Sequence, residues 1–339
     1  MTTKKDKKVA VGVSGGVDSS LSLTLLKERG FSPIGVFMKF WGEENHCCGM
    51  ESERRARKTC DRLNIPFYVL DVREEFKSQV VDYFLKSYAR GETPNPCVVC
   101  NRDIKFRMLF EKIKEFGGSL VSTGHYARKK NGKLFIPKDK EKGQTYFLWS
   151  LKKQDLENII FPLGDLKKSE VRKKAKRLNL PAASVSDSQE VCFVKGELSD
   201  FLSEHIDFEA GEIVSQSGEV LGTHNGLPIY TIGQRRGIGL SGGPFYVLDK
   251  DPKNNRLIVT KSNDDLMEKE VSFREENFFE DIEFPLEVKA KIRYNASKEV
   301  GVLKNKKKFV FEEKQRAIAS GQSIVFYKNG RLIGGGIIT

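Results

Sequence analysis

The sequence predicts an α/β protein: a doubly wound parallel sheet, then a small central domain and a C-terminal β-barrel. Over the first half of the chain, short β-rich runs alternate with longer segments whose apolar residues recur at helical spacing. Such alternation builds parallel sheets covered by helices. Near residue 200 the pattern changes to glycines and short β runs joined by turns, which is typical of small β-domains and barrels.

In the first half we expect four strands, at 8–13, 33–40, 67–72 and 119–127, the last leading into a loop. The segments between the first three strands, 18–30 and 51–65, are expected to be helices, and a third helix is expected at 74–91. Gly30 and Pro66 are suited to end the first two helices. Ligands of such sheets bind beyond the carboxyl ends of the strands.

The second half is expected to contain β-hairpins, among them one that turns at Lys328-Asn329-Gly330. The change in pattern places the domains at 1–199, 200–275 and 276–339. The sequence contains no convincing repeat and no low-complexity tract.

The charge of the chain indicates a nucleic-acid partner. The 339 residues are 39% hydrophobic and 31% charged, with a formal net charge of +12. Basic residues are dense at 127–133 and 167–177, and clustered positive charge is the usual footprint of nucleic-acid binding. No run approaches the length of a membrane span. An apolar run follows the first lysines but breaks at Ser14, and no cleavage site follows. We therefore expect a cytoplasmic protein.

The stretch VSGGVDSS, residues 13–20, joins the first expected strand to the first helix. Glycines let backbone approach a ligand, and the N–H groups at a helix start favour phosphate. Asp18 could hold a magnesium ion that bridges phosphates. The stretch is neither a Walker A loop nor a Gly-x-Gly-x-x-Gly loop. It resembles the pyrophosphate loop of the ATP-pyrophosphatase superfamily, whose members adenylate a carbonyl oxygen.

Six cysteines are too few for a disulfide framework, and close spacing then favours metal binding or catalysis. Cys97 and Cys100 are separated by two residues in TPNPCVVCNRDIKF, where we expect a proline-stiffened loop. Basic neighbours there would favour the thiolate form. Cys60 is expected to be a buried small hydrophobe. Cys47 and Cys48 could bind a metal with His46, although adjacent cysteines chelate one ion poorly.

Several motifs in order give the chain a family resemblance over nearly its whole length. They are GVSGGVDSS, GVFMKFW, TPNPCVVCNRDIKF, STGHYARK, QTYFLWSL, FPLGDLKKSEVRKKA, DSQEVCFV and YTIGQRRGIG. Together they resemble the bacterial tRNA-specific 2-thiouridylases. The resemblance implies a pyrophosphatase-type catalytic domain, a central linker domain and a tRNA-binding barrel. It also implies ATP-dependent sulfur transfer to C2 of the wobble uridine, position 34: ATP adenylates O2, and a cysteine-delivered sulfur displaces AMP.

The resemblance assigns roles residue by residue. It implies catalysis by Cys100, which attacks or receives sulfur, and by Cys192, which carries the persulfide; these two can close a disulfide. For ATP it implies Gly12, Val13, Ser14, Gly15, Gly16, Val17, Asp18, Ser19, Met38, under the adenine, and Gly124. For tRNA it implies Asn95, Lys142, Gly143, Gln144, Arg293 and Tyr294. His125 is a weaker candidate, which could be only a hydrogen-bonded loop residue. A persulfide-bearing donor protein is the implied sulfur source.

Cys97 departs from the family pattern, since many members carry an aspartate there. Two readings stay open. In one, Cys97 fills the place of the aspartate, and Cys100 and Cys192 carry persulfide chemistry. In the other, Cys97, Cys100 and Cys192 hold a four-iron four-sulfur cluster with one open iron, although such clusters usually take four cysteines.

Two other functions remain as alternatives. Another ATP-pyrophosphatase-type ligase would use the glycine loop but would leave the cysteines and the barrel without a task. A non-catalytic RNA-binding protein would explain the charge but not the intact loop.

Overall fold

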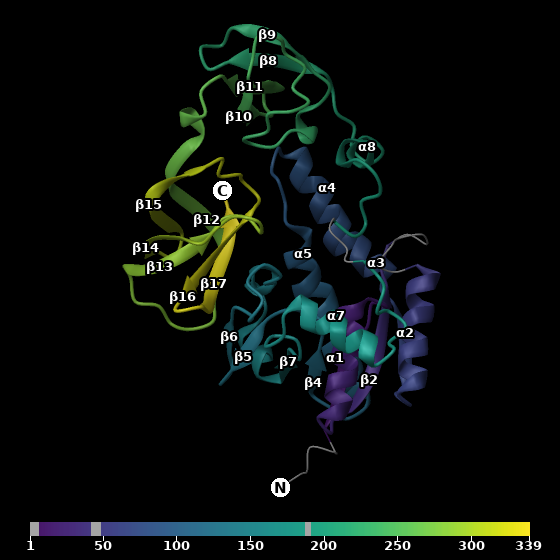
Figure 1. The fold of residues 1–339 in the computed structure, drawn as a ribbon. Coiled ribbons are helices and arrows are strands. Elements are labelled where there is room, and N and C mark those ends of the chain that lie inside the picture. The colour runs from purple at the N-terminus through teal and green to yellow at the C-terminus, as the bar shows by residue number, and fades with distance from the viewer. Residues whose placement is uncertain (1–6, 42–48, 187–190) are drawn as a thin grey trace. The chain divides into compact units, whose positions relative to one another are not determined.

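The computed structural model describes residues 7–41, 49–186 and 191–339, which belong to two compact units (Figure 1). Each unit is assembled from segments that are separate in the sequence. The first unit consists of Met1–Val80, Cys97–Phe193 and Asn329–Ile333, and the second of Val81–Pro96, Val194–Lys328 and Gly334–Thr339.

The first unit is built on a five-stranded parallel sheet, which confirms the predicted α/β fold. Its strands lie in the order β3-β2-β1-β4-β7. Their bounds are β1 (Lys8–Gly12), β2 (Ser32–Lys39), β3 (Phe67–Asp71), β4 (Leu120–Ser122) and β7 (Ile159–Ile160). The chain winds outward from β1 through β2 to β3 and then returns to the other side of β1 as β4. The carboxyl ends of β1 and β4 therefore flank the point where the winding reverses, the usual ligand position in such sheets.

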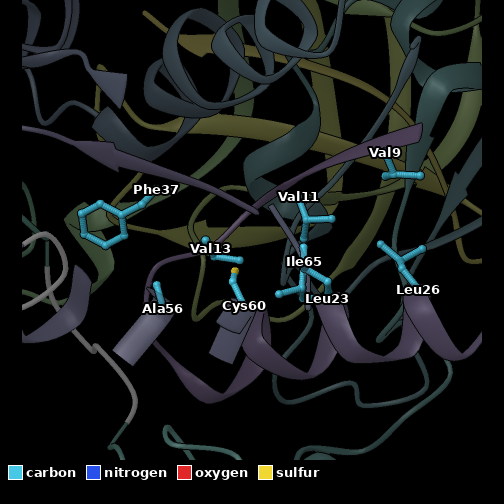
Figure 2. Packing of buried hydrophobic residues seen from close by; sticks show 9 residues of the cluster. All are labelled: Val9, Val11, Val13, Leu23, Leu26, Phe37, Ala56, Cys60 and Ile65. Atoms are coloured by element: carbon cyan, nitrogen blue, oxygen red, sulfur yellow. The ribbon is translucent and has the colours of Figure 1, made fainter. Parts of the chain in front are cut away.

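Helices cover both faces of this sheet. Val9, Val11 and Val13 point to one face, where α1 (Val17–Glu28) and α2 (Met50–Arg62) pack against them (Figure 2). On the opposite face, a side chain added at Gly12 would lie 3.4 Å from Leu109 of α6 (Arg107–Glu115). Helix α7 (Lys168–Arg177) packs against α1.

Cys60 is part of the hydrophobic core, as the sequence predicts. Its side chain is fully buried among Val13, Leu23 and Ala56 (Figure 2). Burial raises the pKa of its thiol to about 12. Cys60 therefore acts as an apolar side chain at neutral pH.

Several expected segments differ from the structure. Strand β4 ends at Ser122, where the expected segment 119–127 passes into its predicted loop. The expected helix over 74–91 is divided into α3 (Arg73–Phe76), a π-helical turn (Lys77–Val81) and α4 (Asp82–Ala89).

The basic stretch 127–133 forms a hairpin of β5 (Arg128–Lys130) and β6 (Lys133–Phe135). Asn131 and Gly132 turn this hairpin with positive φ angles, as two-residue Asn-Gly turns do.

The expected loop around Cys97 and Cys100 is also wrong, because both lie on a helix. Pro96 begins α5 (Pro96–Val99), which continues as a π-helical segment (Cys100–Phe106) into α6. Proline suits the first helical position, where its missing N–H leaves no bond unmade. Cys97 and Cys100 are three residues apart and therefore share one face of this helix.

The second unit contains α8 (Leu198–Ser203), a four-stranded sheet and a β-barrel. The sheet has the order β10-β11-β8-β9, with β8 (Gly211–Ser215), β9 (Val220–His224), β10 (Tyr246–Asp251) and β11 (Arg256–Thr260). The barrel has the order β12-β15-β14-β13-β16-β17 and closes by pairing of β12 with β17. Its strands are β12 (Met267–Phe278), β13 (Leu286–Lys291), β14 (Glu299–Asn305), β15 (Lys308–Arg316), β16 (Ser323–Lys328) and β17 (Arg331–Ile338).

The predicted turn at Lys328-Asn329-Gly330 is present, with positive φ at Asn329 and Gly330. Strand β12 spans residue 275, at which the sequence pattern placed the boundary between the last two domains. Short 3₁₀ helices complete the described chain at Thr145–Leu148, Lys153–Asn158, Leu227–Ile229 and Asp264–Leu266. Within the described ranges, no helix has the length and apolarity to span a membrane.

The packing around Cys60 gives a test of the core. A methyl group added at Gly35 would lie 2.5 Å from the Cys60 sulfur, whereas its other neighbours are at 3.5 Å or more. We therefore expect Gly35→Ala to destabilise the protein by about 1–3 kcal/mol through overpacking. Cys60→Ala in the same chain should recover much of that loss. Urea unfolding of the two single variants and the double variant measures this coupling, and strictly additive effects would contradict it.

Candidate functional site

The loop between β1 and α1 leaves the start of a helix open toward a ligand. Gly16 precedes α1 in an extended conformation, and no side chain caps the helix. The Ser19 hydroxyl instead accepts a hydrogen bond from the Ser14 N–H at 3.1 Å and lies 3.2 Å from the Ser14 hydroxyl. The loop is thus held by its own serines, and the first N–H groups of α1 are suited to bind an anion.

Gly15 is required by the packing of this loop against α2. Its φ angle is +72°, and a side chain there would collide with the backbone carbonyl of Ser52. Arg55, also on α2, donates a hydrogen bond from Nε to the Gly15 carbonyl at 3.2 Å. Helix α2 therefore fixes the loop from one side. Nothing in the sequence pattern marks Arg55 for this role.

Gly124 closes the other side of the loop. It follows β4, and a side chain added there would lie 2.8 Å from the backbone nitrogen of Ser19. Only glycine permits this close approach without movement of the start of α1. The structure thus brings Gly12, Gly15 and Gly124 to the carboxyl ends of β1 and β4, where the winding of the chain through the sheet reverses. This grouping is consistent with the expected phosphate site.

Asp18, the expected magnesium ligand, lies in the first turn of α1 within a polar cluster. Lys168 at the start of α7 contacts both carboxylate oxygens, at 2.8 and 2.7 Å. The hydroxyl of Tyr126 donates to the same carboxylate at 2.8 Å. Lys168 is only 11% exposed, so solvent screens this ion pair less than a surface pair. Lys168 and Tyr126 are site residues that the sequence analysis missed, because they lie 150 and 108 residues from Asp18 in the chain.

The segment expected to contact tRNA at 142–144 supports this cluster. Gln144 pairs with the backbone of Tyr126. The side-chain oxygen of Gln144 accepts from the Tyr126 N–H at 2.9 Å, and the backbone N–H of Gln144 donates to the Tyr126 carbonyl at 3.0 Å. Asp139 accepts from the N–H groups of Lys142 and Lys168. Residues 139–144 therefore help to place the side chains around Asp18.

Met38 is buried and His125 is partly buried near the carboxyl edge of the sheet. Met38 lies on β2 and is 6% exposed. His125 contacts the Thr123 hydroxyl through Nδ1 at 2.7 Å and stacks on Phe106. Burial, with a smaller contribution from the charge of Lys105, lowers the pKa of His125 to about 3. His125 is therefore a neutral, hydrogen-bonded residue.

Cys100 is a protonated thiol in this structure. Its side chain is buried, and burial raises its pKa to about 11 despite the nearby charge of Lys105, which acts in the opposite direction. The neighbouring Cys97 thiol raises the pKa further. The expectation that basic surroundings favour the thiolate is thus wrong for this conformation, because loss of hydration outweighs one cation.

Cys192 lies in a segment anchored by the aromatic side chain that follows it. Phe193 is buried and packs edge-on against Trp41 and Phe76. Cys100 and Cys192, which the family resemblance allows to close a disulfide, are not joined by one in this structure. In the described part of the chain, no three His, Cys, Asp or Glu side chains are grouped to hold a metal ion. The cysteines therefore do not form a cluster site in this conformation. Cys47 and Cys48 lie outside the described residues.

Three expected tRNA-contact residues belong to the second unit. Asn95 is 9% exposed. Arg293 donates from Nη2 to the carbonyls of Arg316 and Ala317, at 2.7 and 2.6 Å. The ring of Tyr294 lies 5.4 Å from the Lys291 ammonium. The guanidinium of Arg293 thus stabilises the end of β15, and replacing it would disturb the barrel as well as any contact with RNA.

Comparison with known families covers nearly the whole chain. Residues 7–196 match the family described as the tRNA methyl transferase HUP domain. Residues 199–261 match the tRNA methyl transferase PRC-barrel domain, and residues 265–338 match the aminomethyltransferase beta-barrel domain.

Curated relatives are similar at full length. The tRNA-specific 2-thiouridylase MnmA of Clostridioides difficile (strain 630) is 41% identical over 355 residues, which cover 98% of each chain. The tRNA-specific 2-thiouridylase MnmA 1 of Thermoanaerobacter sp. (strain X514) is 43% identical over 359 residues, covering 99% of this chain and 98% of the relative. Among solved structures, the U34-tRNA thiolase NcsA of Methanococcus maripaludis with its [4Fe-4S] cluster is 20% identical, with a TM-score of 0.39 over 59% of this chain and 64% of NcsA. That last likeness is too low to support an inference about the site.

The raised pKa of Cys100 predicts its reactivity in the free protein. With a pKa of about 11, about one thiol in a thousand is ionised at pH 8. Iodoacetamide labelling of Cys100, followed by peptide mass spectrometry, should therefore accelerate about tenfold per pH unit up to pH 10. Lys105→Ala should slow labelling further, because it removes the cation that lowers this pKa. Lys114→Ala, on the exposed side of α6, is the control. A labelling rate that levels off below pH 9 would contradict the assignment.

Proposed function

The chain belongs to the family of tRNA-specific 2-thiouridylases, and we propose that it performs ATP-dependent sulfur transfer to C2 of the wobble uridine, position 34, of tRNA. The observation that carries the proposal is the glycine loop between β1 and α1, at the edge of the sheet where the winding of the chain reverses, with Asp18 in the first turn of α1. Its open N–H groups suit phosphate, and the cysteine-bearing helix belongs to the same unit.

ATP is proposed to bind at residues 12–19 and Gly124, with Met38 under the adenine. Asp18 suits a magnesium ion in the way that phosphate-bound magnesium is usually held, by one or two carboxylates together with the phosphates. A magnesium ion would neutralise phosphate charge there. Asp18 is paired with Lys168 in this structure, so a bound ion would compete with Lys168 for the carboxylate. A displaced Lys168 ammonium would remain beside the phosphates as a second positive charge.

The proposed reaction has two stages. Uridine O2 attacks the α-phosphate of ATP and releases pyrophosphate, which converts O2 into a good leaving group. The terminal sulfur of a Cys192 persulfide then attacks C2, and AMP leaves. Attack of the Cys100 thiolate on the Cys192 sulfur frees 2-thiouridine and forms a Cys100–Cys192 disulfide. An external thiol must reduce that disulfide, and a donor protein must supply the next persulfide sulfur.

The reaction requires the Cys100 thiol to become accessible and to lose its proton. Its thiol is buried and protonated here, whereas only the thiolate is a strong nucleophile. We propose that binding of tRNA exposes Cys100 to water. The net charge of +12 favours tRNA as the partner. Asn95, residues 142–144, Arg293 and Tyr294 are proposed contacts, and a cytoplasmic location suits the substrate.

Transfer of a methyl group is the second candidate, because the descriptions of two matching families name it. Methyl transfer from an activated donor needs neither a phosphate-binding loop nor paired thiols. Analysis of the modified nucleoside by mass spectrometry separates the two products, since sulfur for oxygen and an added methyl group differ in mass.

A first test of the proposal removes the carboxylate of Asp18. Asp18→Asn should lower the rate of tRNA thiolation by about 100-fold, because it weakens electrostatic stabilisation of the ATP phosphates. The affinity for tRNA should stay within a few-fold. Asp165→Asn, an exposed carboxylate near α7, is the matched control and should leave the rate unchanged. Thiolation and AMP release at the wild-type rate in Asp18→Asn would remove Asp18 from the ATP site.

A second test separates the two sulfur routes. On the persulfide route, protein purified without oxygen should contain no stoichiometric iron or acid-labile sulfide. Cys97→Asp should thiolate tRNA as well as the parent, whereas Cys100→Ser and Cys192→Ser should be inactive. Iron bound by the parent and lost together with activity in Cys97→Asp would instead require a cluster, and would mean that the three cysteines converge in another conformation.

A further inference from the structure

The residues that precede the cysteine-bearing helix form a short connector, here called the strap, residues 90–94. It leaves α4 and leads through Asn95 into α5, on which Cys97 and Cys100 lie. The strap belongs to the second unit, together with the four-stranded sheet and most of the barrel. Its contacts within that unit show how the start of the cysteine helix is held.

The barrel holds the strap by its backbone. The N–H of Thr93 donates to the Ser320 carbonyl at 2.8 Å, and Nε2 of Gln322 donates to the Thr93 carbonyl at 2.9 Å. Gly321, between these two barrel residues, has a φ of +87°, and a side chain there would lie 2.9 Å from Glu92 Cβ and from the Thr93 nitrogen. The strap therefore packs against the loop before β16, with no room for a side chain at Gly321.

The sheet of the second unit holds the strap from another direction. Gly91 has a φ of +78°, and a side chain there would lie 3.3 Å from Pro252. The hydroxyls of Thr93 and Thr231 are 3.5 Å apart. Neither contact carries charge, so neither fixes the strap as firmly as an ion pair with low exposure would.

One ion pair fastens the strap to a barrel strand. Glu92 accepts a hydrogen bond from Nη2 of Arg274, on β12, at 2.9 Å. Its other carboxylate oxygen is 3.1 Å from Nη2 of Arg90. The side chain of Glu92 is 15% exposed and that of Arg274 is 38% exposed, so this pair is shielded from solvent more than an ordinary surface pair. A charged hydrogen bond of this kind also fixes direction.

We propose that Glu92 and Arg274 are positioning residues for sulfur transfer. Their ion pair fixes the strap to the barrel five residues before Cys97 and eight before Cys100, and so sets where the cysteine helix begins. Neither residue needs to touch the substrate. A displacement of about 1 Å at a reacting group can cost about 100-fold in rate, so loosening the strap should act on the chemical step rather than on binding. The inference rests on the proposed function for its kinetic consequence only.

The experiment is a double-mutant cycle with Glu92→Gln and Arg274→Gln. In single-turnover thiolation with saturating tRNA and ATP, each variant should be about tenfold slower, and the double variant no slower than either single variant. The affinity for tRNA should stay within about twofold. Glu212→Gln and Arg256→Gln break an ion pair of the same 2.9 Å length between β8 and β11, and should leave the rate unchanged.

A second measurement does not depend on activity. Hydrogen–deuterium exchange of peptides covering residues 88–100 should accelerate in Glu92→Gln and in Arg274→Gln, since the Thr93 N–H would be released more often. Unchanged exchange in both variants would overturn the proposal even if the rate falls. Weaker tRNA binding in Arg274→Gln but not in Glu92→Gln would also overturn it, because Arg274 would then be an RNA ligand. A wild-type protein that fails to thiolate tRNA but passes the exchange test would disprove the proposed function and leave the strap's anchorage intact.

Discussion

Close backbone packing at the carboxyl ends of β1 and β4 is the constraint on which the candidate site depends. Gly15 lies against the backbone of α2, and Gly124 lies against the backbone of Ser19, with no room for a side chain at either position. This packing fixes the first turn of α1 without a side-chain cap and leaves its N–H groups for a ligand. Asp18, in the same turn, takes its position from the same constraint.

The reactive groups of the candidate site are neutralised in this structure. The Asp18 carboxylate is balanced by Lys168 and Tyr126, and burial keeps the Cys100 thiol protonated. Both conditions follow from the cost of isolated charge in a poorly hydrated place. The proposed substrates would change both: ATP with a divalent cation would bring new charge to Asp18, and tRNA would change the surroundings of Cys100. The reaction would then be restricted to the complex in which both substrates are bound.

The two units share the task of presenting the cysteines. The helix with Cys97 and Cys100 is packed within the first unit, where Asn101 donates to the Phe147 carbonyl and Ser150 to that of Val98. The strap before it is held within the second unit by Ser320, Gln322 and Arg274. The chain therefore passes from one unit to the other at Pro96 and Cys97. Movement of the strap would reach the cysteines directly through the backbone.

The sequence alone determined the parallel sheet, the glycine loop, the later β-domains and the core role of Cys60, because each depends on local periodicity, turn chemistry or composition. It did not reveal that Pro96 begins a helix instead of stiffening a loop, since a proline fits both. Only the tertiary structure paired Asp18 with Lys168, placed Arg55 against the glycine loop and joined Glu92 to Arg274. It also buried Cys100, and that burial raises the thiol pKa by more than the basic neighbours lower it. Such pairings join residues up to 182 positions apart, and desolvation depends on every neighbour in space, so neither can be read from a local pattern.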